Sequence, residues 1–258
     1  MSELKIMTLN VKNASITSSF AKRATSIQEL VRWHDPDIIG TQELIDPMID
    51  YLPELTETYT FYGKARGSAG NTNERTCLLF KKDRFELLRG DTFWLSSTPD
   101  VRGSRFLESL FPRISTFALL KDKLTEQTFT FANTHLDHLL PATRAKQAAV
   151  LRDKLIEVKD GDFLVLTGDF NSSYLSLAVH TLVSSPELDL KDTVPTDGVS
   201  TIRSFIQAGT SHFRPIDHIL VSKNLEVLKS EIITGMYMGR YPSDHCPVLT
   251  VIKLPEAE

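Results

Sequence analysis

Short apolar segments with β-strand character dominate this chain, and they restrict its fold more than any other feature. About eleven segments show apolar alternation or short apolar runs rich in Phe, Val, Ile and Thr. The predicted strands are Leu4 to Val11, Asp37 to Thr41, Tyr59 to Tyr62, Thr76 to Phe80, Phe85 to Leu95, Arg113 to Leu120, Gln127 to Thr134, Phe163 to Thr167, Ile216 to Val221, Leu225 to Ile233 and Val248 to Leu254. A chain with so many strands must build its core mainly from sheets.

Helical spacing is much rarer than strand patterning. The apolar positions from Ile27 to His34 follow i, i+3, i+4, i+7 spacing, and a similar stripe lies within Ala142 to Lys159. A shorter helix is predicted over Leu175 to Val183, before Ser184, Ser185 and Pro186. Three helices beside so many strands predict an α+β protein with stacked sheets and helices on the outside.

Composition indicates one large globular domain over residues 1–258. The chain is 41% apolar and 24% charged, close to globular averages, and no Gly-, Pro- or Ser-rich linker divides it. No signal-peptide pattern or membrane-length apolar run is present, and Cys77 and Cys246 show no disulfide or zinc spacing. We therefore expect a cytoplasmic protein with no membrane association and no obligate protein partner. The net charge of −4 argues against a surface built to hold duplex nucleic acid.

Acid, amide and histidine side chains recur where predicted strands begin or end. They are Asn10, Glu43, His135, Asp169 with Asn171, Asp217, and Asp244 with His245. Singly, each has an ordinary explanation: Asn10 as a turn residue, Glu43 or Asp169 as a helix cap, and His135 as a half-buried surface histidine. Together they are harder to dismiss, because a group of buried carboxylates is costly without a counter-charge. The pattern predicts that several strand ends converge on one pocket holding a cation or a basic ligand.

The residue types in this set favour a hard divalent cation. Carboxylate and amide oxygens predominate, histidine is a minority and cysteine is absent, which suits Mg²⁺ (or Mn²⁺) better than Zn²⁺. Such an ion activates water beside a histidine and offsets charge on a pentacovalent phosphorus. The sequence therefore predicts a metal-dependent hydrolase of phosphate esters.

The order and spacing of these residues also resemble a known family. The matching blocks are Thr8-Leu9-Asn10, Gln42-Glu43, Asn133-Thr134-His135-Leu136-Asp137, Gly168-Asp169-Phe170-Asn171, Ile216-Asp217-His218-Ile219 and Ser243-Asp244-His245-Cys246-Pro247-Val248. Across nearly the whole chain they look like the signature of the endonuclease/exonuclease/phosphatase superfamily. Phe93-Trp94-Leu95-Ser96 and Pro112-Arg113-Ile114 further resemble a bacterial branch related to the carbon-catabolite-repressor deadenylases. The resemblance implies a four-layer α/β/β/α sandwich, with two packed, mostly antiparallel sheets and helices outside.

The resemblance also implies metal ligands and supporting residues. Glu43 would be the principal metal ligand, helped by Asn10 and Asp244. Glu74 matches the family's acid that supports the metal or His135.

The remaining catalytic roles concern water, phosphate and proton transfer. Asp169 and Asn171 would align the attacking water or a second metal, and His135 would steady the phosphoryl oxygens. His245 would be the base or a phosphate contact, oriented by Asp217. His138, in contrast, follows Asp137 in a predicted loop and is expected to matter far less.

Substrate-binding residues are expected in loops rich in basic and aromatic side chains. Arg66, Arg75, Arg113 and Tyr241 are the candidates, although the aromatic residues before Ser243 could equally serve only in packing. A phosphodiesterase or nuclease is favoured. The alternatives are a phosphatase or lipid-type phosphodiesterase acting on a small phosphorylated sugar, inositol or head group, and a catalytically silent binding module, which the complete motif set disfavours.

Overall fold

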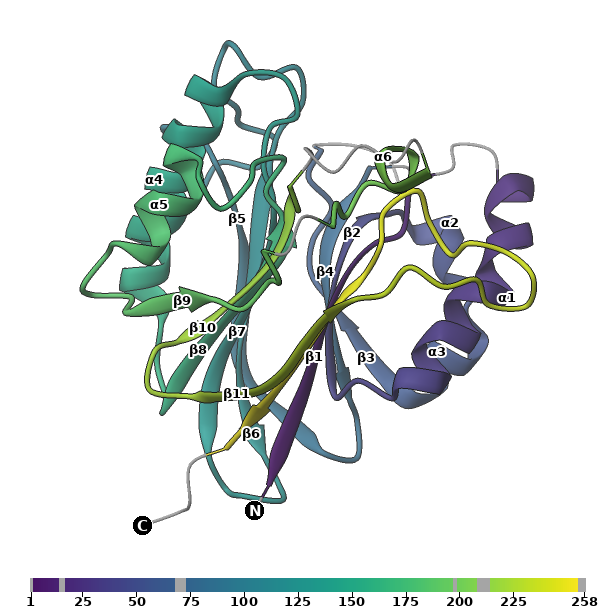
Figure 1. The fold of residues 1–258 in the computed structure, drawn as a ribbon. Helices are drawn as coiled ribbons and strands as arrows, with labels where there is room; N and C mark the ends of the chain where they lie inside the picture. The colour runs from purple at the N-terminus through teal and green to yellow at the C-terminus, as the bar shows by residue number, and fades with distance from the viewer. Residues whose placement is uncertain (1, 14–16, 68–72, 197–198, 208–213, 255–258) are drawn as a thin grey trace.

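The computed structural model describes residues 2–13, 17–67, 73–196, 199–207 and 214–254. The strands in these ranges form two six-stranded sheets that pack face to face (Figure 1). The first sheet has the order β11 (Glu226–Ile232), β12 (Val248–Lys253), β1 (Glu3–Asn10), β2 (Ile38–Leu44), β4 (Arg75–Lys81) and β3 (Tyr59–Tyr62). The second has the order β5 (Phe85–Trp94), β6 (Ile114–Asp122), β7 (Thr128–His135), β8 (Phe163–Asp169), β10 (Asp217–Ser222) and β9 (Leu190–Asp192). Within these sheets, only the pairs β1–β2 and β7–β8 are parallel.

Helices cover the outer face of each sheet. On the first sheet lie α1 (Thr17–His34), α2 (Asp46–Ile49) and α3 (Pro53–Thr58), and on the second lie α4 (Pro141–Val158) and α5 (Leu177–Val183) (Figure 1). A short helix, α6 (Arg203–Gln207), lies near the same end of the molecule as α2 (Figure 1). None of the helices in the described ranges is long and apolar enough to cross a membrane. The arrangement is the four-layer α/β/β/α sandwich expected from the sequence.

Three apolar clusters fill the three spaces between the four layers. Phe20 and Leu30 of α1 pack against the first sheet, Phe129 and Phe131 of β7 lie between the sheets, and Leu151 of α4 packs against the second sheet. Both sheets are therefore buried on two faces, which explains why many strands read as continuous apolar runs.

Every predicted strand is present: Tyr59 to Tyr62 matches β3 at both ends, and no end of any other strand is shifted by more than three residues. Short elements were missed: β9 has three residues, and α2, α3 and α6 have four to six. Segments this short display too little of a two- or 3.6-residue period to be recognised. The first predicted helix begins earlier than its apolar stripe, at Thr17.

Candidate active site

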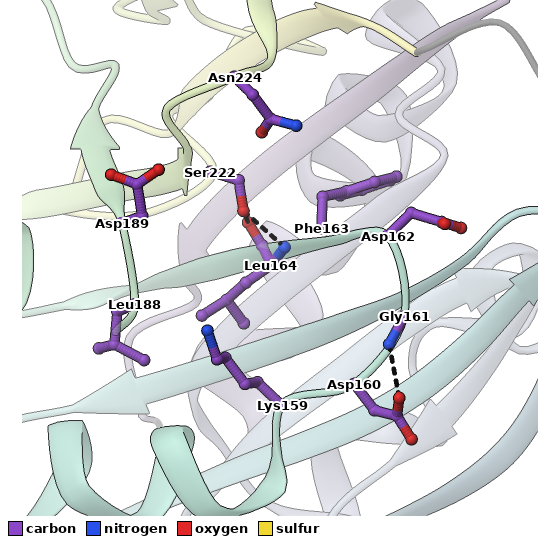
Figure 2. A pocket seen from close by; sticks show the side chains of 10 residues that line it. All are labelled: Lys159, Asp160, Gly161, Asp162, Phe163, Leu164, Leu188, Asp189, Ser222 and Asn224. Atoms are coloured by element: carbon purple, nitrogen blue, oxygen red, sulfur yellow. Dashed lines mark hydrogen bonds between the residues drawn. The ribbon is translucent and has the colours of Figure 1, made fainter. Parts of the chain in front are cut away.

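Two cavities mark opposite ends of the second sheet. The larger, about 520 Å³, surrounds the start of β8 and is lined by Lys159, Asp160, Gly161, Asp162, Phe163, Leu164, Leu188, Asp189, Ser222 and Asn224 (Figure 2). None of these residues belongs to the predicted site. The smaller, about 250 Å³, is lined by Glu43, Arg66, Glu74, Phe111, Arg113, His135, His138, Asp169, Asn171 and His245. All of these except Phe111 and His138 were predicted from the sequence, so we identify this cleft as the candidate site.

Strand alternation directs the site residues into the space between the sheets. In β8, Phe163 and Val165 face the other sheet, and the two-residue period carries Asp169 to the same face. Register then aligns the neighbouring strands, because His135 of β7 and Asp217 of β10 both pair with Asp169. Three polar side chains on three adjacent strands thus converge at one end of the sheet.

Glu43 requires a local irregularity to reach the cleft. By alternation it would follow Ile39 toward the helices on the outer face. Instead, the β2–β4 register shifts between Thr41 and Leu44, and Glu43 adopts a left-handed backbone with φ of 63°. Its Oε2 then accepts a 2.7 Å hydrogen bond from the backbone N–H of Asn13. A strained, bulged strand end is a frequent feature of functional sites.

A buried polar seam joins the two sheets directly beneath the cleft. The side chain of Gln42 donates to Asn133 Oδ1 at 2.7 Å, and Asn133 Nδ2 donates to the carbonyl of Thr41 at 2.8 Å. These two side chains are fully buried and belong to opposite sheets. Gln42 is next to Glu43 in the sequence, and Asn133 lies two residues before His135. The seam therefore fixes Glu43 of one sheet relative to His135 of the other.

Asn10 lies between two carboxylates from opposite sheets. Its Nδ2 donates to Glu43 Oε1 and to Asp169 Oδ2, both at 3.0 Å, while its Oδ1 accepts from the backbone N–H of Lys12 at 2.9 Å. The amide hydrogens therefore partly offset the two negative charges, as a cation at this point would. For Asn10 to ligate a metal through oxygen, its amide must rotate and give up the bond from Lys12.

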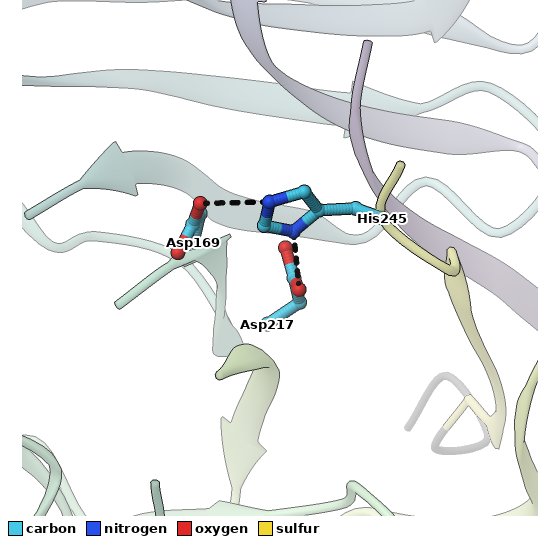
Figure 3. Close-up of side chains that lie close together, drawn as sticks. All are labelled: Asp169, Asp217 and His245. Carbon is cyan, nitrogen blue, oxygen red and sulfur yellow. Dashed lines mark hydrogen bonds and ion pairs between the residues drawn. The ribbon is translucent and has the colours of Figure 1, made fainter. Parts of the chain in front are cut away.

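Asp217 and His245 form a hydrogen-bonded pair beside Asp169 (Figure 3). The His245 Nδ1 lies 2.9 Å from Asp217 Oδ2, and its Nε2 lies 3.9 Å from Asp169 Oδ2. Burial lowers the pKa of His245, but the charges of Asp217, Asp169 and Asp244 outweigh it and raise the pKa to about 10. In this arrangement the ring is an imidazolium at neutral pH.

His135 and Asp169 have pKa values shifted in opposite directions from those of ordinary side chains. Burial, followed by the charges of Arg113 and Arg66, holds the pKa of His135 well below its usual value, so this histidine is neutral. Burial and the neighbouring Asp217 raise the pKa of Asp169 to about 6. The cleft thus holds a neutral and a charged histidine on either side of a carboxyl that titrates near neutral pH, a pattern typical of acid–base sites.

Two predicted metal-site acids have other partners in the structure. Asp244 Oδ2 contacts Lys12 Nζ at 2.8 Å, and about half of its side chain is exposed. Glu74 accepts from Asn13 Nδ2 at 2.9 Å and pairs with Arg66 at 2.6 Å. Direct ligation by Asp244 would require Lys12 to move away. Glu74 lines the cleft, but its carboxylate is paired with Arg66.

The predicted substrate-binding residues divide into two pairs. Arg66 and Arg113 line the cleft. Arg75, in contrast, is held by both carboxylate oxygens of Asp46 at 2.6 and 2.8 Å, and Tyr241 stacks under the guanidinium of Arg203 at 3.8 Å. Neither Arg75 nor Tyr241 is among the residues lining the cleft.

Comparison with known proteins agrees with the geometry of the cleft. The model of the endonuclease/exonuclease/phosphatase family matches residues 7–245, a span that includes every motif block up to His245. The chain belongs to this family. The expected divalent-metal dependence of such proteins fits the oxygen-rich donor set of Glu43, Asp169 and Asn10.

Two solved structures resemble nearly the whole chain, and one curated relative resembles part of it. An endonuclease/exonuclease/phosphatase from Bacteroides vulgatus is 27% identical, with a TM-score of 0.87 and coverage of 99% and 100% of the two chains. A mannosyl-6-phosphatase from Bacteroides thetaiotaomicron is 28% identical, with a TM-score of 0.84 and coverage of 97% and 100%. Tyrosyl-DNA phosphodiesterase 2 from Danio rerio is 22% identical over 172 residues, which are 66% of this chain and 42% of that protein. The chain thus spans less than half the length of this curated relative.

Phe111 and His138 line the cleft, although the sequence analysis placed neither in the site: Phe111 was not considered, and His138 was expected to matter far less than His245. His138 does lie in a loop, but its Nδ1 is 3.0 Å from Arg113 Nη2 and its ring stacks on Phe111 with a 6.2 Å centroid distance. The family motifs gave no weight to either residue. The nearest signal was the sequence Phe111-Pro112-Arg113, where an aromatic residue precedes a predicted phosphate-binding arginine.

Proposed function

We propose that this protein hydrolyses phosphate esters with a divalent cation, Mg²⁺ or Mn²⁺, and the Asp217–His245 pair. The observation that carries the proposal is that the carboxylates of Glu43 and Asp169, which line one cleft, each lie 3.0 Å from Asn10 Nδ2. Two carboxylates so placed are costly unless a positive group lies between them.

Glu43, Asp169 and, after rotation of its amide, Asn10 are the residues that would hold the cation. Asp244 would join them if Lys12 were displaced. When bound, the cation supplies charge to offset that on the pentacovalent phosphorus and lowers the pKa of the attacking water. Mg²⁺ or Mn²⁺ is proposed because all of these ligands are oxygen atoms, which hard cations prefer.

The chain's own groups would orient the phosphate and move the proton. Asp169 would align the attacking water, and the backbone N–H of Asn171 fixes one Asp169 oxygen by a 2.9 Å hydrogen bond. Charged His245 would donate from Nε2 to a phosphoryl oxygen or leaving group, while Asp217 holds its Nδ1–H. Neutral His135 would contact another phosphoryl oxygen.

The class of ester remains a choice between two candidates. A phosphodiester or nucleic-acid substrate is the prediction from the sequence, and the likeness to a tyrosyl-DNA phosphodiesterase is compatible with it. A small phosphorylated sugar is the second candidate, favoured by the whole-chain likeness to a mannosyl-6-phosphatase. A cytoplasmic location also stays a prediction.

A hydrolysis screen with and without Mg²⁺ or Mn²⁺ tests the proposal. The panel is a bis-aryl phosphodiester, an aryl phosphomonoester, mannose 6-phosphate, single-stranded RNA and abasic DNA. We expect metal-dependent turnover of at least one ester and its loss in Glu43→Gln. Cation-independent turnover, or turnover unchanged in Glu43→Gln, would refute the metal mechanism. No turnover of any ester, with no calorimetric binding of Mn²⁺, would favour the binding-module alternative.

A further inference from the structure

Arg113 places a buried guanidinium beside the cleft with no carboxylate bound to it. The residue is 4% exposed, and the one hydrogen bond of its guanidinium to a described residue joins Nη2 to His138 Nδ1 at 3.0 Å. Its Nε and Nη1 have no hydrogen-bond partner in the part of the chain that the structure describes. Burial, followed by the charge of Arg66, lowers its pKa, but arginine stays charged in proteins. A buried unpaired charge is costly, and an anion in the cleft would offset that cost.

Another buried arginine of the same chain shows what a purely structural role looks like. Arg84 is 8% exposed, and its guanidinium contacts Asp37 at 2.9 Å and Asp122 at 2.7 Å. Arg66, beside Arg113, is likewise paired with Glu74. Arg113 differs from both because no carboxylate in the described part of the chain contacts its guanidinium; like Arg66, it lines the cleft.

The neighbours of Arg113 fix a second hydrogen-bond donor at the cleft. Because an arginine N–H can only donate, His138 Nδ1 must accept, and the proton of a neutral His138 ring resides on Nε2. The His138 ring stacks on Phe111, which fixes its plane. The guanidinium of Arg66 also lies over Phe111, 4.9 Å from the centroid of its ring. This wall therefore presents the unpaired charge of Arg113, the guanidinium of Arg66 with its partner Glu74, and the ring of His138 to a ligand.

We propose that Arg113, held by His138 and assisted by Arg66, selects the dianion of a phosphomonoester, so that this site prefers phosphomonoesters to phosphodiesters. The inference rests on the proposed phosphoesterase function. The reaction adds water across the P–O ester bond and yields an alcohol and inorganic phosphate.

Charge and oxygen count both favour the monoester at this wall. A monoester carries a charge near −2 at neutral pH and three terminal oxygens, whereas a diester carries −1 and two. A second ester group would replace one charged oxygen with a weak acceptor and leave the guanidinium less compensated. Sites built around buried donors discriminate strongly against ligands that leave those donors unpaired.

The test uses two substrates with the same leaving group, p-nitrophenyl phosphate and methyl p-nitrophenyl phosphate, with Mn²⁺ or Mg²⁺. Arg113→Met removes the charge and retains an apolar side chain, and His138→Phe keeps a ring on Phe111 but removes the acceptor for Arg113. Arg89→Met is the matched control, because Arg89 is half exposed and contacts Asp160 at the far end of the second sheet. Thermal unfolding establishes that each variant is folded.

We expect wild-type kcat/KM to be higher for the monoester. In Arg113→Met, kcat/KM for the monoester should fall about a hundredfold, and kcat/KM for the diester should fall less than about fivefold. Arg89→Met should leave kcat/KM unchanged for both substrates. His138→Phe should lower the monoester value about tenfold and the diester value little. This split distinguishes selection from a structural role, which would lower both values together.

Calorimetry provides a second measurement that does not depend on turnover. Inorganic phosphate should bind the metal-loaded wild type more tightly than dimethyl phosphate does, and Arg113→Met should reduce this difference. Equal losses on both esters, or a wild type that prefers the diester, would overturn the inference while leaving the phosphoesterase function intact. Failure to hydrolyse either ester and every ester of the wider screen would refute the proposed function, and the inference would fall with it.

Discussion

Removing His245 should cost stability as well as activity, and the loss of stability should be partly reversed by a second substitution. Asp217 is 1% exposed, its Oδ2 accepts from His245, and its Oδ1 has no partner within the described ranges. His245→Ala therefore leaves a buried carboxylate without a counter-charge, which costs about 3–5 kcal/mol. Asp217→Asn added to His245→Ala removes that charge. We expect the double variant to be at least about 1 kcal/mol more stable than His245→Ala.

Activity should behave differently from stability in the same set of variants. Turnover should fall on the order of a thousandfold in His245→Ala, because a positioned proton donor or phosphate contact is lost. Asp217→Asn alone should give a smaller drop, since it loosens the ring without removing it. The double variant should be little slower than His245→Ala, because Asp217 acts on turnover only through His245.

Urea unfolding and steady-state turnover on one ester measure both effects in all four proteins. If the two substitutions reduce turnover additively, the side chains act independently and the pairing is catalytically irrelevant. If the double variant is less stable than His245→Ala, the buried charge of Asp217 is not the cause of the destabilisation. Either result would refute the reasoning drawn from the 2.9 Å contact.

Three further outcomes are expected. Glu43→Gln and Asp169→Asn should each lower turnover roughly a hundredfold or more while keeping the fold, and near-wild-type turnover in either would remove that residue from the mechanism. Excess chelator should abolish activity and added Mg²⁺ or Mn²⁺ restore it, whereas full turnover with no metal retained by elemental analysis would contradict this. Gly40→Ala should destabilise the protein by about 1–3 kcal/mol, because its Cβ would lie 2.0 Å from Thr167 Oγ1 of the opposite sheet. Gly235→Ala is its control, since the nearest atom there is 3.9 Å away, and equal urea midpoints for the two variants would rule out the clash.

The repeating strand pattern explains why much of the cleft could be predicted from the sequence. A strand that ends in a polar residue leaves that residue at a sheet edge, and this reasoning holds for Asn10, His135 and Asp169, all of which come together. The family resemblance added the pairing of Asp217 with His245, which sequence spacing alone could not supply. In the structure that pairing depends on an antiparallel register that places Asp217 opposite Asp169.

Strand alternation alone could not place residues whose position depends on irregular backbone; Glu43 was predicted from the family resemblance instead. Glu43 reaches the cleft only through a bulge and a positive φ, so simple alternation would send it to the wrong face. Lys12, also at positive φ, contacts Asp244 across more than two hundred residues of sequence, a distance that no local pattern spans. The position of His138 at the cleft could not be predicted because its partner, Arg113, lies in the loop before β6 and not in the same motif.

The two sheets contribute different residues to the proposed site. Asn10 and Glu43 come from the first sheet, while Asp169, His135 and Asp217 come from the second, so the distance between the sheets sets the geometry of the proposed metal site. The seam of Gln42 and Asn133 fixes that distance with hydrogen bonds buried from solvent. Arg66, Arg113 and His138, in contrast, lie in loops or at strand starts outside the seam. If the proposed roles hold, substitution there should change which phosphate is bound without moving the groups proposed to cleave it.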